Sequence, residues 1–276
     1  MNQSWIPRHS GPLLWTMCLA LIAPASAAVR AEEGTVAERP QKLRIVIFGA
    51  HCDDPESGAG GLMALLSQAG HDVIAAYGTC FRGGRKFFGQ PEAIVRQREA
   101  EAACRILGAT PKFFPYAHEK LVADEATVKA VAAWLDEVKP DIVVTHWPFD
   151  THPNHHAVSS LVWQCYQRPA GWNLYFFEVM TGRQTLGFHP DLYLDIGPVV
   201  ATKKGACFCH KSQQPEGFWA VHEEMHQRRG AECGVRFAEA YVLLEPKPGR
   251  PRLPVPFLPQ RPTGGGPLTP RRAEGR

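Results

Sequence analysis

Three short runs of apolar, largely β-branched residues constrain the fold of this chain more than any other feature. They cover residues 43–49, 73–77 and 142–145, and stretches with apolar residues at helical spacing lie between them. Runs that are apolar throughout are typical of parallel strands buried on both faces of a sheet. Strands that alternate with helices therefore predict an α/β fold, a Rossmann-like three-layer sandwich with a mostly parallel central sheet.

The remaining periodic segments extend this alternation. Gly70 and Gly108 are typical helix stops, and residues 51–61, rich in Asp, Pro and Gly, are predicted to form a loop. The predicted helices cover residues 62–69, 91–107, 125–138, 202–210 and 217–230, and a further one runs from Pro153 or Asn154 to 166. Residues 113–116 are predicted to be a short extended piece, and the later predicted strands cover residues 174–179 and 192–196.

The two ends of the chain differ from its centre. Arg8 precedes an apolar run over residues 12–24, and small residues follow it, which is the pattern of a secretory signal peptide cleaved after Ala27. A membrane anchor is the alternative, but this run is shorter than the about 20 residues that a span needs and ends in Pro24. We therefore expect export to the periplasm or the exterior, without stable membrane insertion after cleavage. The predicted organisation is a signal peptide over 1–27, a linker over 28–42, one domain over 43–245 and a disordered Pro/Gly-rich tail over 246–276.

Charge and cysteine content limit the partners and the cross-links. The formal net charge is +3 for 276 residues, which is too small to indicate a nucleic-acid partner. Eight cysteines are present, and removal of Cys18 with the signal peptide leaves seven, so at least one thiol is unpaired. We interpret most of them as small buried apolar residues. One or two disulfides remain possible, and the sequence does not assign the pairs.

Two polar segments, residues 51–56 and 150–156, each follow a predicted buried strand. Because ligands bind at the carboxyl ends of parallel strands, both segments are expected at the same edge of the sheet. Together they offer His and Asp side chains, and two His with one carboxylate and an open position for water are what catalytic zinc requires. An Asp pair in a loop is more often solvated or a helix cap. The two segments together favour a metal site over that alternative.

These residues resemble the motifs of a known family. Ala50-His-Cys-Asp-Asp-Pro-Glu56 resembles the Ala-His-Pro-Asp-Asp-x-Glu motif of the LmbE-like family, which includes the N-acetylglucosaminyl-phosphatidylinositol (PIG-L) de-N-acetylases. Residues 152–155 resemble its His-Pro-Asp-His motif. Further matches follow in the same order over residues 43–245. They are Arg98-Glu99 with Leu107-Gly108 for an Arg-x-x-Glu helix, residues 210–213 for His-x-Ser-Gln, and Arg229-Gly230, Gly234 and residues 238–240 for the closing segment.

The resemblance implies a role for each matching residue. His51, Asp54 and His155 would bind Zn²⁺, with another divalent metal as the alternative. Asp53 would be the general base that activates water. His152 would orient or stabilise the tetrahedral intermediate. His210 would lie near the substrate and donate to the oxyanion or the leaving nitrogen. Arg82 and Arg98 would hold polar groups of the substrate or else lie on the surface.

Two departures from the motifs bear on activity. Cys52 stands where the family has Pro, and we interpret it as a spacer because its neighbours already supply a full set of ligands. Asn154 stands where the family has Asp; if that Asp supports an imidazole through a charged hydrogen bond, Asn weakens the support. His156 is a rival ligand, although the motif spacing favours His155.

The expected function is zinc-dependent hydrolysis of an N-acyl amide, with acetyl the expected group, on an amino sugar or a related small polar conjugate. The alternative is a noncatalytic glycan-binding module that keeps the fold and the metal. A nucleotide-binding Rossmann protein is disfavoured, because the first loop lacks Gly-x-Gly-x-x-Gly and places carboxylates where phosphates would bind.

Overall fold

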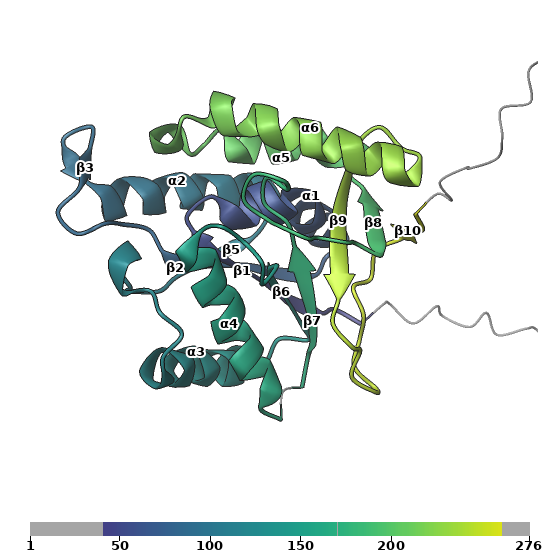
Figure 1. Cartoon of the computed structure of the whole chain (residues 1–276), viewed down its shortest axis with the longest axis horizontal. Helices are drawn as coiled ribbons and strands as arrows, with labels where there is room; N and C mark the ends of the chain where they lie inside the picture. The colour runs from purple at the N-terminus through teal and green to yellow at the C-terminus, as the bar shows by residue number, and fades with distance from the viewer. Residues whose placement is uncertain (1–40, 170, 261–276) are drawn as a thin grey trace, which may run out of the picture. The chain divides into compact units, whose positions relative to one another are not determined.

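The computed structural model of the chain describes residues 41–169 and 171–260. The predicted signal peptide and most of the predicted linker lie outside these residues. A single eight-stranded sheet, in the order β10-β8-β9-β7-β6-β1-β2-β5, forms the centre of the described part (Figure 1). Within the described ranges, none of the helices combines the length and the apolar character that a membrane span requires.

Five neighbouring strands run parallel and confirm the predicted mostly parallel sheet. They are β1 (Arg44–His51), β2 (Asp72–Thr79), β5 (Thr110–Phe113), β6 (Ile142–His146) and β7 (Asn173–Phe177). Three more strands extend one edge through antiparallel pairs, namely β8 (Leu192–Asp195), β9 (Ala238–Leu243) and β10 (Phe257–Leu258). β1 and β6 lie in the middle of the sheet, so their carboxyl ends meet at one edge.

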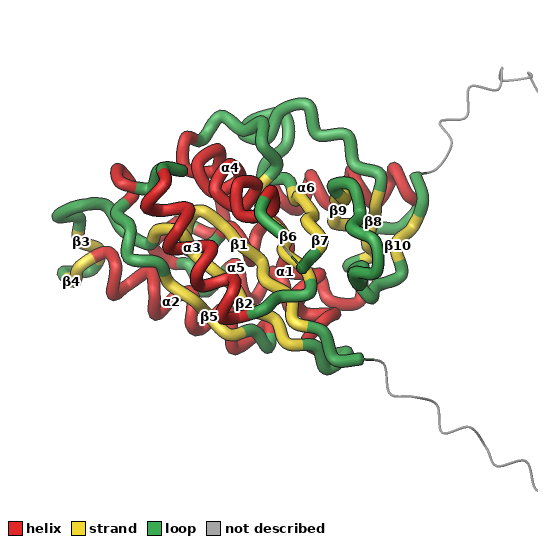
Figure 2. The backbone as a smooth tube through the Cα atoms, turned by 90° about the horizontal axis from the view of Figure 1, so that it is seen from below, coloured by secondary structure: helices red, strands yellow, loops and turns green. Residues whose placement is uncertain are grey.

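Helices cover both faces of the sheet (Figures 1 and 2). One layer consists of α1 (Asp54–Gln68), α2 (Glu92–Leu107), α5 (Val200–Cys207) and α6 (Pro215–Cys233), and the other of α3 (Glu125–Val138) and α4 (Pro153–Gln167). Ile45 and Ile47 belong to the core under the first layer, whereas Val46 and Phe48 belong to the core under the second. This alternation explains why β1 is apolar throughout. Short elements complete the chain, namely the hairpin β3 (Lys86–Phe87) and β4 (Gln90–Pro91) and the 3₁₀ turns η1 (His118–Lys120), η2 (Gly197–Val199) and η3 (Lys211–Gln213).

The first helix begins earlier than the sequence predicted. Residues 51–61 were expected to form a loop, but α1 starts at Asp54, with Pro55 in its first turn, where proline is tolerated. The glycines that indicated a loop instead permit close packing, because a Cβ atom on Gly58 would lie 2.3 Å from the Phe177 ring. Their small size, rather than a loop conformation, is what this part of the fold needs.

Helix α1 contains an internal break that a buried carboxylate compensates. Ala59 has non-helical backbone angles, and the N–H groups of Gly61 and Leu62 donate to the Glu239 carboxylate at 2.7 and 2.8 Å. Lys203 is fully buried and donates to the same carboxylate at 2.6 Å. Glu239 on β9 therefore satisfies backbone groups that the break leaves unbonded, which holds the first turns of α1 in their place beside β1.

The predicted disordered tail does not begin at Pro246. Leu253 is buried and its N–H donates to the Tyr175 hydroxyl at 3.1 Å. Phe257 and Leu258 form β10 at the edge of the sheet. Apolar residues separated by prolines thus pack on the sheet despite a composition that suggests disorder. Residues 261–276 of the predicted tail lie outside the described residues.

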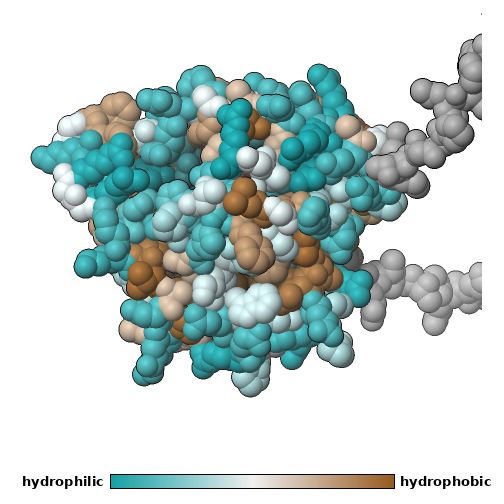
Figure 3. All heavy atoms as spheres, viewed as in Figure 1, coloured by the Kyte–Doolittle hydropathy of each residue, from teal (hydrophilic) through white to brown (hydrophobic). Residues whose placement is uncertain are grey.

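The described surface is mainly hydrophilic on the face seen in Figure 3, where apolar residues form several separate areas. Exposed large apolar residues belong to distant parts of the sequence, such as Phe88, Ile106 and Phe149. Scattered exposed apolar residues are normal for a globular protein.

Candidate active site

A cleft of about 210 Å³ opens at the carboxyl ends of the central parallel strands. Its lining includes His51, Asp53, Asp54, Arg96, His152 and His155. The two polar segments singled out in the sequence therefore come together, as expected for the carboxyl edge of a parallel sheet. A larger cleft, of about 470 Å³, lies at the opposite edge near the ends of α3 and α4, and its lining contains no histidine.

Asp54 is the centre of the cleft's polar network. Its Oδ2 atom lies 3.2 Å from Nδ1 of His51, 3.2 Å from Nε2 of His146 and 3.4 Å from Nε2 of His155. The backbone N–H of His51 also donates to this oxygen at 2.7 Å. A tetrahedral zinc site with bonds of about 2.0–2.2 Å places its donor atoms about 3.3 Å apart. The spacing around Asp54 therefore fits a metal held by this carboxylate and neighbouring imidazoles.

Two overlapping groups of side chains have donor atoms within 4.8 Å of one another: His51, His152 and His155, and Asp54, His146 and His155. Hydrogen bonds distinguish the members. The N–H of Ala50 donates to Nε2 of His146 at 3.0 Å, so the single lone pair of this nitrogen is already used. His51 and His155 remain, and Nε2 of His51 is buried without a hydrogen-bond partner in the described part of the chain.

His152 differs from the other imidazoles because it caps a helix. Its Nδ1 atom accepts a hydrogen bond from the N–H of Asn154 at 3.2 Å, at the start of α4. Burial lowers the pKa of His152 to about 4, so the ring is neutral at pH 7. A neutral ring that accepts at Nδ1 carries its proton on Nε2. His152 is therefore suited to donate a hydrogen bond into the cleft rather than to bind a metal there.

His155 lies between two carboxylates. Its Nε2 atom is 3.4 Å from Asp54, and its Nδ1 atom is 3.2 Å from Oδ1 of Asp150. Burial opposes a charge on this ring, but Asp54 and Asp150 raise the pKa of His155 to about 10. The arrangement favours a positive charge at this position, supplied by a proton or by a metal ion. A ligating histidine commonly donates its other nitrogen to a carboxylate, which is the place of Asp150 here.

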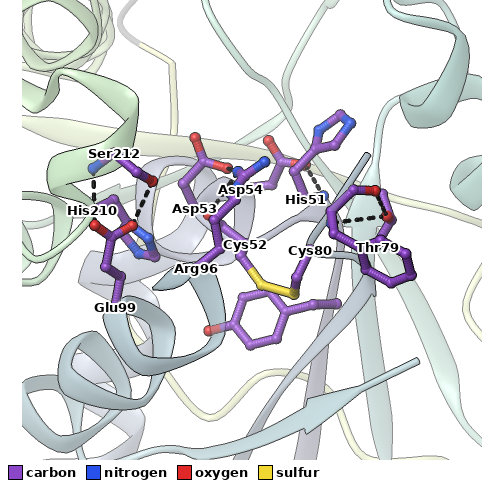
Figure 4. The surroundings of a disulfide bond; sticks show 12 residues. His51, Cys52, Asp53, Asp54, Thr79, Cys80, Arg96, Glu99, His210 and Ser212 are labelled. Carbon is purple, nitrogen blue, oxygen red and sulfur yellow. Dashed lines mark hydrogen bonds and ion pairs between the residues drawn. A yellow bond between two sulfur atoms is a disulfide. The ribbon is translucent and has the colours of Figure 1, made fainter. Parts of the chain in front are cut away.

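Asp53 faces away from this group and pairs with Arg96 on α2. Nη2 of Arg96 donates to Oδ1 of Asp53 at 2.8 Å and to the carbonyl oxygen of Cys52 at 3.0 Å (Figure 4). Burial raises the pKa of Asp53 to about 6, while Arg96 opposes the rise. Burial also disfavours the charge of Asp54, but the surrounding histidines more than offset it and hold the pKa of Asp54 well below its usual range. The two adjacent carboxylates thus have opposite environments, which raise the pKa of Asp53 and lower that of Asp54.

His210 does not line the cleft, although the family resemblance implied that it would lie near the substrate. It is fully buried behind Asp53, and its Nε2 atom is 3.3 Å from Oε1 of Glu56. Glu56 also accepts a hydrogen bond from Tyr77 at 2.6 Å. Burial works against protonation of His210, but Glu56 and Asp53 raise its pKa. Its position favours an electrostatic effect on Asp53 rather than a contact with substrate.

The Arg-x-x-Glu motif was assigned to the wrong arginine. Arg98 is exposed and bonds Gln90 at 3.0 Å, outside the cleft. Arg96 is the buried residue that reaches Asp53, and Glu99, three residues later, binds both the N–H and the hydroxyl of Ser212 (Figure 4). The i, i+3 spacing of Arg96 and Glu99 is the signal that identifies the pair, because it places both on one face of α2. Arg82 lines the cleft with an exposed side chain.

The departures from the family motifs have local explanations. The side-chain amide of Asn154 donates to the carbonyl oxygen of His118 at 3.1 Å and does not support an imidazole, since Asp150 holds that place. His156 is exposed and its ring bonds the backbone of Asp150, away from Asp54. Cys52, interpreted as a spacer, forms a disulfide with Cys80. Sequence reasoning also missed His222, a buried residue of α6 that lines the cleft.

Comparisons with known proteins agree with this geometry. Residues 46–166 match the family model of the GlcNAc-PI de-N-acetylases, PIG-L. A probable N-acetyl-α-D-glucosaminyl L-malate deacetylase 2 of Bacillus cereus is 27% identical over 208 residues, which cover 68% of this chain and 90% of the relative. A 4-oxalmesaconate hydratase of Pseudomonas putida is 28% identical over 233 residues, covering 75% of this chain and 88% of that protein.

A solved structure confirms the fold. A conserved protein of Thermus thermophilus superposes with a TM-score of 0.63 at 25% identity, covering 74% of this chain and 96% of that protein. The family match, the relatives and the ordered motifs agree on the same assignment. Residues 46–166 are therefore similar to the PIG-L, or LmbE-like, family.

Proposed function

We propose that this protein is a zinc-dependent de-N-acylase that hydrolyses an N-acetyl amide on an amino sugar or a related small polar conjugate. The observation that carries the proposal is the division of labour between two adjacent carboxylates. Asp54 faces the imidazoles of His51 and His155, whereas Asp53 faces Arg96 and the cleft. A site that only bound a glycan would have no use for a second carboxylate with a pKa near 6 beside the metal position.

His51, Asp54 and His155 would hold the metal. Two neutral nitrogen donors and one carboxylate are a common donor set for catalytic zinc, and Asp150 would orient His155 from behind. When bound in such a site, zinc acts as a Lewis acid and lowers the pKa of water in its open position.

Asp53 would move the proton. Its carboxylate takes a proton from the attacking water and returns it to the nitrogen of the leaving amine. A pKa of about 6 suits this double role, because the group is ionised at neutral pH and is still basic enough to accept a proton. Arg96 keeps the carboxylate oriented through its 2.8 Å hydrogen bond.

His152 would stabilise the oxygen of the amide as it becomes an oxyanion. Its Nδ1 atom is engaged at the start of α4, so its Nε2–H group is the one that can donate into the cleft. Arg82 at the rim would contact polar groups of the substrate. The relative that acts on a glucosaminyl L-malate supports a small sugar conjugate as the substrate class.

A second candidate is the addition of water to a carbon–carbon double bond. The hydratase of Pseudomonas putida supports it, and so do Arg82 and Arg85 in the cleft, because a guanidinium suits the carboxylates of such a substrate. The two reactions differ in their products, since only amide hydrolysis releases acetate and a free amine.

We also propose that the protein acts outside the cytoplasm. The signal peptide expected over residues 1–27 supports this, and a disulfide between buried cysteines is typical of exported proteins. Fractionation of the producing cells would test it, with full-length chain in the cytoplasm as the contradicting result.

The proposal is tested by acetate release from N-acetylated sugars of increasing size, measured with the zinc-loaded chain and with the chain after chelation. We expect release only with metal. In the Asp53→Asn variant, zinc binding should persist while turnover falls by about a hundredfold or more. Turnover at the wild-type rate in that variant would remove Asp53 from the mechanism, and hydration of a double bond without acetate release would favour the second candidate.

A further inference from the structure

The disulfide of the described chain lies directly beside the candidate site. It joins Cys52, which stands between His51 and Asp53, to Cys80, the residue after β2 (Figure 4). Both side chains are buried. The other cysteines in the described ranges are free: Cys104, Cys165, Cys207, Cys209 and Cys233. Cross-linking is therefore confined, in the described part, to the strand end that carries the site.

The bond continues the pairing of two strands beyond their last backbone contact. β1 and β2 pair in parallel as far as His51 and Thr79, and the disulfide joins the next residue of each strand. After this point the two segments separate, because β1 leads into α1 and β2 leads toward Arg82 at the rim of the cleft. The covalent link therefore fixes the segment where backbone hydrogen bonding ends.

Cys52 is also the point where Arg96 holds the backbone. Arg96 donates through Nη2 to the Cys52 carbonyl at 3.0 Å and to Asp53 Oδ1 at 2.8 Å. Asp53 has backbone angles of φ 156° and ψ −20°, which residues other than glycine rarely adopt. Such angles persist only where the surroundings fix the backbone on both sides. The disulfide provides this on one side and the start of α1 provides it on the other.

The family motif that this segment resembles has proline at the position of Cys52. Proline restricts its own φ angle to about −65° and so stiffens the segment within the chain. Cysteine has no such restriction. The bond from Cys52 to Cys80 supplies a comparable restraint from a neighbouring strand. This explains how a residue without a fixed φ angle is compatible with this position.

We propose that the Cys52–Cys80 disulfide is a positioning element of the candidate site, which holds His51 and Asp53 in place in the oxidised chain. The inference rests on the proposed function. Formation of the bond joins the two sulfur atoms and transfers two electrons and two protons to a disulfide oxidant, which leaves as two thiols. We expect the reduced chain to keep the fold but to lose precision at the site.

The bond itself is tested by alkylation of the denatured full-length chain before and after reduction, followed by peptide mapping. We expect two more reactive thiols after reduction, located at Cys52 and Cys80. Both residues alkylated without reduction, in protein purified under oxidising conditions, would overturn the proposal.

Its positioning role is tested with three variants of the full-length chain, assayed well below each Tm. Cys52→Ala/Cys80→Ala removes the bond, Cys52→Pro/Cys80→Ala replaces it by the proline restraint, and Cys209→Ala removes a free, half-buried thiol as the control. In the double-alanine variant we expect zinc affinity, measured by chelator competition, and kcat each to fall by about 10–100-fold, with KM unchanged. The proline variant should recover most of both, and the control should match the wild type.

A bond that only stabilised the fold would lower Tm and leave zinc affinity and kcat unchanged, which would overturn the proposal. Failure of the proposed function gives a different pattern. If the oxidised wild-type chain binds zinc but releases no acetate from any N-acetylated sugar, the proposed reaction is wrong. The zinc affinities of the same three variants then still decide whether the disulfide positions the site.

Discussion

Nη2 of Arg96 lies 2.8 Å from Oδ1 of Asp53, and this contact joins the second helix of the fold to the end of its first strand. Because Arg96 favours the ionised carboxylate, it limits the rise in the pKa of Asp53 that burial causes, which leaves that pKa at about 6. The pair therefore sets both the position and the basicity of the proposed general base.

The Arg96–Asp53 pair predicts a shifted pH profile. Ionised Asp53 is the active form, so kcat/KM of the wild type should fall as the pH drops below about 6. In Arg96→Gln the pKa of Asp53 rises further, so the acid limb should move to higher pH and the plateau should fall by about tenfold or more. Arg98→Gln is the matched control, because that neighbour is exposed and its side chain donates to Gln90 outside the cleft. An unshifted limb in Arg96→Gln would contradict the assignment.

Adjacent histidines on α4 should differ sharply in metal binding. His155 is buried between Asp54 and Asp150, whereas His156 is exposed and its ring bonds the backbone of Asp150. We expect His155→Ala to abolish stoichiometric zinc binding and His156→Ala to retain it, as measured by metal analysis after dialysis. Equal zinc contents in the two variants would show that the motif spacing misidentifies the ligand.

Asp150 should act on the metal through His155. Asp150→Asn keeps the shape of the side chain but removes its charge, so zinc affinity should fall by about 10–100-fold while zinc still binds. Asn154→Asp is the informative companion, because the side-chain amide of Asn154 donates to the His118 carbonyl, whereas Asp150 is the carboxylate beside His155. We expect that restoring the family's Asp at this position does not raise zinc affinity in a chelator titration. A gain there would assign the supporting role to residue 154 instead.

The sequence could predict part of this site because its residues follow the carboxyl ends of parallel strands. Apolar runs located β1 and β6, and because ligands bind at the carboxyl ends of such strands, the sequence placed residues 51–56 and 150–156 at one edge of the sheet. The choice of His51, Asp54 and His155 within these segments came from the family resemblance. His146 was missed because a single histidine at the end of a buried strand has no distinguishing pattern. Arg96 was missed because the Arg-x-x-Glu spacing, which fits Arg96 and Glu99, was assigned to Arg98 instead.

Long-range partners account for the other differences. Cys52 and Cys80 are 28 residues apart, and eight cysteines allow too many pairings for the sequence to choose among. Gly58 and Gly61 suggested a loop because the local sequence does not show what packs against them. The side chains that do, Phe177 and Ile196, belong to distant segments of the sequence. In each case the local sequence is consistent with more than one structure, and only the fold identifies the partner.

A buried histidine outside the metal group predicts acid sensitivity of the fold. Burial lowers the pKa of His226 well below its ordinary value of 6.5. In the unfolded chain this histidine titrates near 6.5, so the unfolded state binds more protons as the pH falls below that value. The free energy of unfolding should therefore decrease by about 1.4 kcal/mol per pH unit from this residue. We expect the free energy of unfolding of His226→Gln, measured by denaturant titrations below about pH 6.5, to fall less steeply with decreasing pH than that of the wild type. An unchanged pH dependence would contradict this prediction.

Close packing of α1 on β7 predicts a difference between two glycines in helices. A Cβ atom at Gly58 would lie 2.3 Å from the Phe177 ring, whereas Gly205 in α5 has open space around the same position. Gly58→Ala should destabilise the protein by about 1–3 kcal/mol through overpacking, and Gly205→Ala should stabilise it by roughly 0.5–1 kcal/mol through helix propensity. Equal effects on the midpoint of unfolding would show that the contact between α1 and β7 is looser than described.

In the proposed site, one cation binds to His51, Asp54 and His155 with Asp53 beside it. An anomalous difference map at the zinc absorption edge, from crystals of the zinc-loaded chain, tests it most directly. We expect a single strong peak about 2.0–2.2 Å from one donor atom of each of these three side chains. A peak bound instead by His146 or His152, or the absence of a peak in this cleft, would contradict it.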